Sequence, residues 1–142
     1  MKGYTSETIR NVALVGHGGC GKTTFLESAL LATGVIDRLG KVEDGNTVSD
    51  YDKMEIEKGF SINTSIVPVE WKDSKINFID TPGYFDFIGE VNAALRASEA
   101  AVILVDAGHG GVDSGMVGIG GLKEKGINLD IAMKLKTILE KK

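Results

Sequence analysis

Four short stretches along the chain have apolar patterns typical of β-strands. Residues Asn11–Val15 are rich in β-branched side chains and end at a glycine, which predicts a buried strand. Residues Thr64–Trp71 alternate between two faces, and Lys75–Ile79 follows after a short link, so the two predict an antiparallel hairpin. Residues Ala100–Val105 are continuously apolar, which is typical of a strand covered by helices on both faces.

Helical periodicity occurs between and after these strands. Apolar residues recur at helical spacing within Thr23–Ala32 and within Phe85–Ser98. A last helix is expected over Leu129–Lys141, capped by Asn128, with its apolar positions facing inward. These inward positions are Ile131, Ala132, Leu135, Ile138 and Leu139. Strands that alternate with helices predict a three-layer α/β domain.

Two segments lack a regular period and are expected to be loops. Residues 34–61 are polar, which predicts a long mobile loop, and the stretch Val42–Gly59 within it has the character of a switch. Residues Gly108–Gly121 form a glycine-rich loop. The predicted strand order is the hairpin strand, the strand at Ile76, the strand at Val12 and the strand at Val102. That order leaves residues 100–105 at the edge of the sheet, and an apolar edge invites pairing with a second copy of the chain.

Composition excludes several classes of protein. The 142 residues carry 16 Lys and Arg against 20 Asp and Glu, and this mild acidity disfavours direct nucleic-acid binding. No apolar run approaches the ~18–20 residues that cross a bilayer, and the first residues lack the apolar core of a signal peptide. A cytoplasmic protein without membrane contact is therefore expected. The single cysteine, Cys20, excludes an internal disulfide.

The 19 glycines, against 2 prolines, gather in two clusters, and the first has a clear chemical meaning. Residues Gly16–Thr23 read GHGGCGKT and match G-x-x-x-x-G-K-[ST] between a strand and a helix, which is typical of a P-loop that wraps a polyphosphate. Lys22 would reach the β- and γ-phosphates, and Thr23 would ligate Mg²⁺. The sequence DTPG after a strand adds Asp80 as a second magnesium group and Gly83 as a γ-phosphate donor. The predicted nucleotide-binding residues are Gly16, His17, Gly18, Gly19, Cys20, Gly21, Lys22, Thr23, Thr24, Asp80 and Gly83.

Four segments in order, GHGGCGKTT, GKVEDGNTVSD, EIEKGFSI and INFIDTPGYFDFIGEV, resemble the GTPase domain of elongation factor G and its paralogues. The resemblance covers about residues 1–107 and implies GTP or GDP with Mg²⁺. It places Ser61 where the family has a threonine that reaches Mg²⁺ and the γ-phosphate. Tyr84 stands where the family usually has a histidine that positions the attacking water, so weak or absent GTP hydrolysis is expected.

The guanine-recognition motif of that family is missing. No NKxD or TKxD occurs in the 142 residues, so the phosphate half of the site is present and the base half is not. The leading hypothesis is therefore a domain that binds GDP or GTP mainly through the phosphates. The alternatives are a folded chimera without activity and a remnant of a zinc site.

The zinc alternative comes from the second glycine cluster. Residues 105–142 contain DAGHGG, a D-x-G turn, GLKEK and NLDIAMKLK, and resemble the first β-α element of zinc-dependent N-acetylmuramoyl-L-alanine amidases. The resemblance implies His109 and Glu124 as two of three zinc ligands, but the third histidine and the catalytic glutamate have no counterpart. Amidase activity is not expected. The chain is thus interpreted as one α/β domain over 1–142, in which a truncated GTPase-like part, 1–107, is followed by an amidase-like loop and helix, 108–142.

Overall fold

The computed structural model describes residues 3–140, which form two compact units, one ending at Leu104 and the other beginning at Val105. Lys141, the expected end of the last helix, lies outside the described residues. The elements of the first unit are β1 (Ile9–Val15), α1 (Lys22–Ala32), α2 (Lys53–Lys58), β2 (Ser65–Trp71), β3 (Ser74–Asp80), a 3-10 turn (Phe85–Phe87), α3 (Ile88–Arg96) and β4 (Ala100–Ile103).

The four strands form one mixed sheet in the order β2-β3-β1-β4. Strand β1 runs parallel to both neighbours, with Val12 opposite Phe78 of β3 and Ala100 of β4. Strand β2 pairs antiparallel with β3 along its whole length, as a hairpin. The predicted strand order and the single antiparallel pair are confirmed.

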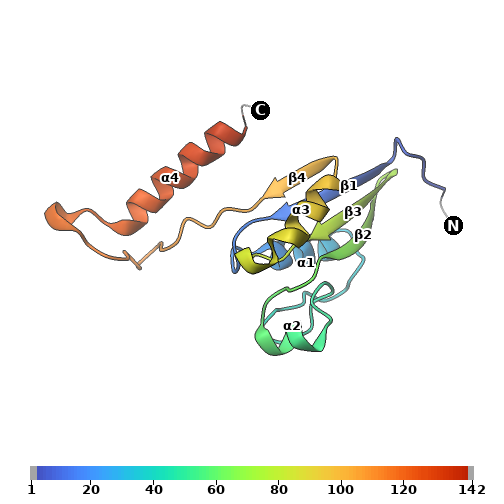
Figure 1. Ribbon diagram of the computed structural model, residues 1–142, viewed down its shortest axis with the longest axis horizontal. Helices are drawn as coiled ribbons and strands as arrows, with labels where there is room; N and C mark the ends of the chain where they lie inside the picture. Colours follow the sequence, from blue (N-terminus) through green and yellow to red (C-terminus); the bar gives the residue numbers. More distant parts are fainter. Residues whose placement is uncertain (1–2, 141–142) are drawn as a thin grey trace. The chain divides into compact units, whose positions relative to one another are not determined.

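Helices α1 and α3 cover opposite faces of this sheet (Figure 1). Successive residues of β1 point to opposite faces, so Leu14 joins the α1 side and Ala13 joins the α3 side. The core on the α1 side contains Leu14, Leu26, Leu30, Val67 and Val69. The smaller core on the α3 side contains Ala13, Ile79 and Ala94. This three-layer arrangement matches the α/β fold expected from the sequence.

Helix α2 lies within the segment that was expected to be an irregular loop, and that expectation is wrong there. Asp52 caps the helix, since its side chain accepts a hydrogen bond from the Met54 N–H at 2.8 Å. Gly59 ends it in the left-handed conformation, with its N–H bonded to the Glu55 carbonyl. Only one side chain of this short helix, that of Glu55, is buried, so no apolar period marks it in the sequence.

Strand β4 is shorter and more exposed than its apolar sequence predicts. It ends at Ile103, whose side chain is 49% exposed, and Ala100 and Ala101 are exposed as well. Within the described sheet β4 has a strand neighbour only on its β1 side, as the predicted order requires. The apolar run therefore identified the strand correctly, and within the first unit alone its side chains are only partly covered.

The second unit contains a 3-10 turn (Ile119–Gly121) and α4 (Glu124–Leu139). The helix begins earlier than predicted, with Lys123 at its N-cap. Asn128 therefore lies inside the helix, where its side-chain amide donates to the Gly108 carbonyl at 3.3 Å. Within the described part of the second unit, taken by itself, the apolar positions of this helix have no covering partner, and Ile131 and Ile138, for example, are exposed. No helix among residues 3–140 combines the length and the apolar character needed to cross a membrane.

Candidate functional site

Residues 16–21, which the sequence predicts to be a phosphate loop, connect β1 to α1. Gly19 and Gly21 have φ angles of 80° and 91°, which L side chains rarely adopt. Gly21 is the N-cap of α1, and it supplies no side chain to cap the helix. The first N–H groups of α1 therefore point into the loop without a side-chain partner, which is a favourable arrangement for an anion.

Lys22 lies inside this loop. Its side chain is 6% exposed, and its ammonium group donates hydrogen bonds to the carbonyls of Gly16 at 2.9 Å and His17 at 3.0 Å. An ammonium has three protons, so a further acceptor can be bound. On the other side, the Gly83 carbonyl accepts from the Gly18 N–H at 3.0 Å, so the DTPG turn contacts the phosphate loop directly.

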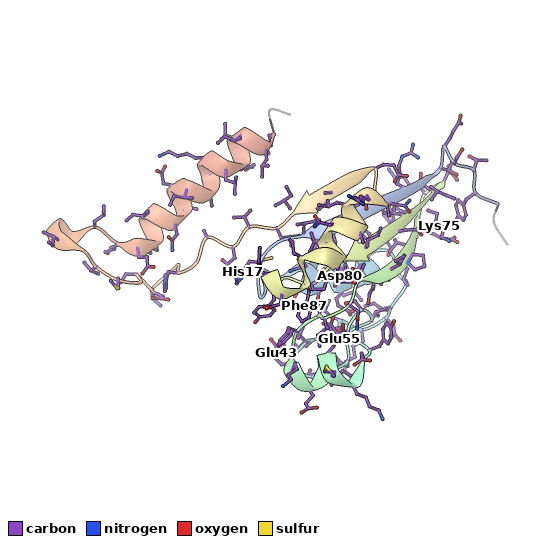
Figure 2. All side chains as sticks on the ribbon, in the orientation of Figure 1. His17, Glu43, Glu55, Lys75, Asp80 and Phe87 are labelled. Atoms are coloured by element: carbon purple, nitrogen blue, oxygen red, sulfur yellow. The ribbon has the colours of Figure 1, made fainter. Side chains whose placement is uncertain are left out.

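Thr23 and Asp80, which the sequence assigned to the same metal ion, are in contact. The Thr23 hydroxyl donates to Asp80 Oδ2 at 3.0 Å, and Asp80 Oδ1 is buried with no hydrogen-bond partner among residues 3–140. Burial raises the pKa of Asp80 to about 6, against the opposing effects of the Thr23 hydroxyl and the nearby Ser49 hydroxyl. Asp80 stands at the end of β3, beside the phosphate loop that follows β1 (Figure 2). The arrangement leaves a carboxylate oxygen available to a cation.

A second buried acid, Asp50, was missed in the sequence. Its Oδ1 accepts a hydrogen bond from the Ser61 hydroxyl at 2.7 Å, and its Oδ2 is buried and has no partner in the part of the chain that the structure describes. Burial raises the pKa of Asp50, and the negative charges of Glu55 and Glu27 raise it further, while the Ser61 hydrogen bond lowers it. The signal was present, because Asp50 ends the quoted GKVEDGNTVSD segment, but nothing in the pattern indicates that the side chain turns inward.

A cavity of about 200 Å³ lies between the phosphate loop and the segment 42–61. It brings together most of the predicted residues, including Lys22 and Thr23, with Ser61 and Asp50 on the facing segment. The remaining predicted lining residues are Gly18, Gly19, Gly21, Thr24 and Gly83. Gly16, His17, Cys20 and Asp80 are not among the lining residues. The first two contribute carbonyls to Lys22 instead.

Tyr84 forms one wall of this cavity. Its ring centroid lies 4.7 Å from that of Phe60 and 6.3 Å from that of His17. A Cβ atom added to Gly18 would lie 3.1 Å from the Tyr84 ring, so the ring packs against the bare backbone there. Tyr84 thus contacts both the phosphate loop and the facing segment.

The two residues predicted as zinc ligands, His109 and Glu124, are neighbours in the second unit. His109 Nε2 lies 3.6 Å from Glu124 Oε2, and His109 Nδ1 lies 2.9 Å from Asp113 Oδ2. The hydrogen bond to Asp113 raises the pKa of His109, and it lowers the pKa of Asp113. Within residues 3–140 no group of three or more His, Cys, Asp or Glu side chains is arranged to hold a metal ion.

Comparison with known proteins gives a consistent result. The family model of the elongation factor Tu GTP binding domain matches residues 7–138. Elongation factor G of Granulibacter bethesdensis is 47% identical over 100 residues, and an elongation factor G-like protein of Mycobacterium tuberculosis is 43% identical over 102 residues. These matches cover 70% and 72% of this chain but 14% of each relative.

Solved structures show the same fold. A crystal structure of a Thermus thermophilus protein superposes with a TM-score of 0.68 at 35% identity, over 90% of this chain and 18% of that one. The Saccharomyces cerevisiae Ski7 GTPase-like domain, in a structure bound to GTP, superposes with a TM-score of 0.58 at 22% identity, over 70% of this chain and 25% of that one. The family match reaches residue 138, and the phosphate loop and DTPG turn lie within it. The chain belongs to the family of elongation factor Tu-type GTP-binding domains.

Proposed function

We propose that this chain binds GDP or GTP with Mg²⁺ and recognises the nucleotide mainly through its phosphates. The observation that carries the proposal is the position of Lys22, whose ammonium group lies within the phosphate loop next to the N-terminus of α1. A cation and a helix N-terminus directed at one point favour a polyphosphate there. The family membership supports the same ligand class.

The donor set of the site fits Mg²⁺. Magnesium prefers oxygen ligands and is usually bound by one or two carboxylates with phosphates and water. Asp80 and Asp50 each have a buried carboxylate oxygen that finds no partner among the described residues, and Thr23 and Ser61 provide hydroxyls beside them. Of these, Thr23, Ser61 and Asp80 are the proposed magnesium residues. Bound Mg²⁺ would offset the negative charge of the phosphates.

Hydrolysis of GTP is proposed to be weak or absent. Tyr84 occupies the position at which related GTPases usually have histidine, and its ring packs against Gly18 and Phe60. The neutral hydroxyl of a tyrosine is a poor proton acceptor compared with an imidazole. Nucleotide binding does not depend on that side chain, since the phosphate contacts come from the loop.

Titration with a fluorescent GDP tests the proposal. Lys22→Ala should weaken binding at least about 10-fold, because a charge-assisted contact to phosphate is lost. Lys53→Ala, which changes an exposed lysine on α2, is the matched control and should bind like the unmodified protein. Absence of binding, or binding indifferent to Lys22, would contradict the proposal and favour a folded protein without nucleotide activity.

Competition by ATP in the same titration tests base selection. Since no NKxD or TKxD motif is present, discrimination between GDP and ATP should be small. Strong preference for guanine would require base contacts from residues outside the motifs described above.

Zinc binding by His109 and Glu124 in the second unit is a second candidate function. The observation that favours it is the 3.6 Å separation of His109 Nε2 and Glu124 Oε2, with Asp113 on the other ring nitrogen. A carboxylate on the distal nitrogen of histidine is typical of zinc ligands. Metal analysis of the unmodified protein and His109→Ala decides it, because equal and negligible zinc in both removes the hypothesis.

A second copy of this chain is the protein partner that we propose. Strand β4 has a strand neighbour only on its β1 side in the described sheet, and Ile103 is half exposed. An edge of this kind can add a strand from another molecule. Light scattering should show a dimer that Ile103→Lys weakens, and a monomer at all workable concentrations would exclude pairing.

A further inference from the structure

Glu27 is a buried acid on α1 that the proposed nucleotide chemistry does not use. Its side chain is 1% exposed, although it lies on the same helix as Lys22 and Thr23. It does not line the cavity at the phosphate loop. A carboxylate is buried only where its oxygens find strong partners, so the partners of Glu27 indicate what it does.

Both carboxylate oxygens of Glu27 accept hydrogen bonds from backbone N–H groups of residues 40–48. Glu27 Oε2 accepts a hydrogen bond from the Gly40 N–H at 3.0 Å, and Oε1 accepts one from the Val48 N–H at 2.6 Å. Hydrogen bonds to an ionised acceptor are roughly twice as strong as neutral ones. One side chain of α1 therefore fixes two points of the segment 40–48.

Gly40 lies so close to Glu27 that there is no room for a side chain at this position. A Cβ atom at this position would lie 2.6 Å from Glu27 Oε2 and 2.7 Å from the Asn46 carbonyl oxygen. A substitution at Glu27 or a substitution at Gly40 should therefore disrupt the same contact.

The fixed segment leads directly to the cavity. Asp50 follows Val48 by two residues, and it holds Ser61 through a hydrogen bond of 2.7 Å. Both Asp50 and Ser61 line the cavity opposite Lys22. The geometry points to Glu27 as a positioning residue that fastens the segment 40–50 to α1, keeps Asp50 and Ser61 opposite the phosphate loop and slows nucleotide release. Its effect on nucleotide release rests on the proposed function.

Two other glutamates provide an internal comparison. Glu55 accepts the N–H groups of Ile62 and Asn63, each at 2.9 Å, and Glu90 accepts the Thr64 N–H at 3.1 Å. These bonds hold residues 62–64 in place without Glu27. Loss of Glu27 should therefore loosen residues 40–48 and leave residues 62–64 unchanged.

Amide hydrogen exchange of the nucleotide-free protein is the first test. In Glu27→Gln and in Gly40→Ala, exchange in the peptide that spans residues 40–48 should be at least about 10-fold faster, as expected for loss of a buried hydrogen bond. Exchange at residues 62–64 and in β1 and β3 should change less than about 2-fold. The control Glu57→Ala, at an exposed glutamate on α2, should have no effect. Unchanged exchange at 40–48, or equal acceleration throughout the sheet, would overturn the assignment.

Release of fluorescent GDP in the presence of Mg²⁺ is the second test. Glu27→Gln should raise the dissociation rate constant at least about 5-fold and leave the association rate constant within about 2-fold, a pattern that general destabilisation does not produce. Faster exchange at 40–48 with unchanged dissociation would overturn the effect on the nucleotide. If the unmodified protein binds no nucleotide, the proposed function fails and the effect on release fails with it, while hydrogen exchange still decides whether Glu27 fastens the segment.

Discussion

The ring of Tyr84 lies against the ring of Phe60, with their centroids 4.7 Å apart and their planes inclined by 59°. Phe60 belongs to the segment that faces the phosphate loop, and Tyr84 follows the DTPG turn directly. The Tyr84 ring also packs on the backbone of Gly18. A single aromatic side chain therefore joins the three parts that surround the cavity.

Replacing Tyr84 by histidine should raise GTP hydrolysis. An imidazole can accept a proton from water near neutral pH, whereas the neutral hydroxyl of tyrosine is a poor proton acceptor. We expect Tyr84→His to increase single-turnover phosphate release at least about 10-fold, with the affinity for GDP within about 3-fold. Tyr84→Phe, which keeps the ring, should not increase the rate. Equal rates in the histidine and phenylalanine variants would show that the position does not limit hydrolysis.

Removing the Thr23 hydroxyl should affect both stability and magnesium dependence. In Thr23→Val the buried Asp80 carboxylate loses its hydrogen-bond donor, which should lower the free energy of unfolding by roughly 1–3 kcal/mol in urea denaturation. Removal of Mg²⁺ by EDTA should weaken GDP binding to the unmodified protein. It should change GDP binding to Thr23→Val little, because this variant has already lost a proposed magnesium ligand. Ser28→Ala removes an exposed hydroxyl from the same helix and serves as the control. A variant that responds to EDTA like the unmodified protein would exclude Thr23 as a magnesium ligand.

The sheet could be predicted from the sequence because its signals are local. The alternation of Thr64–Trp71 indicates a hairpin strand, and the glycine motif after Asn11–Val15 places a helix after β1. Helix α2 could not be predicted from periodicity, since its burial comes from one acidic side chain, Glu55, that binds backbone N–H groups. The start of α4 was predicted too late because Asn128 resembles a cap, while Lys123 does not.

The candidate site was predictable only where a motif fixes its spacing. Lys22, Thr23 and Asp80 come from motifs whose residues must meet at the ends of parallel strands. The structure brings Thr23 into contact with Asp80 and places Lys22 and Thr23 at the same cavity. Asp50 and Glu27 were missed because nothing in the sequence distinguishes a carboxylate that turns inward from one in solvent. Their roles depend on hydrogen bonds between residues far apart in the chain.

Replacing Asp113 by asparagine should lower the pKa of His109. The Asp113 carboxylate accepts a hydrogen bond from His109 and raises its pKa above the ordinary value of 6.5. A raised pKa in the folded state adds stability that is fully present below pH 6.5 and is lost as the pH rises through the folded pKa. The histidine titration followed by NMR should therefore move to lower pH in Asp113→Asn. Asp130→Asn, which removes the partner of Lys134, is the control, and an unchanged His109 midpoint in Asp113→Asn would contradict the contact.

A side chain at Gly83 should disrupt the contact between the DTPG turn and the phosphate loop. A Cβ atom there would overlap the Gly18 backbone and lie 2.6 Å from Lys22 Nζ, and neither the loop backbone nor the enclosed ammonium can move away without losing hydrogen bonds. We expect Gly83→Ala to lower the free energy of unfolding by about 1–3 kcal/mol, as overpacking does in well-packed sites, and to weaken GDP binding. Gly89→Ala is the matched control, because Gly89 lies in α3 and nothing lies within 4 Å of the added atom. Alanine also favours a helix, so this variant should be as stable as the unmodified protein or about 0.5–1 kcal/mol more stable. Urea denaturation and GDP titration of the two variants compare their free energies of unfolding and their affinities for GDP. Equal values in both variants would mean that the turn does not pack against the phosphate loop in solution.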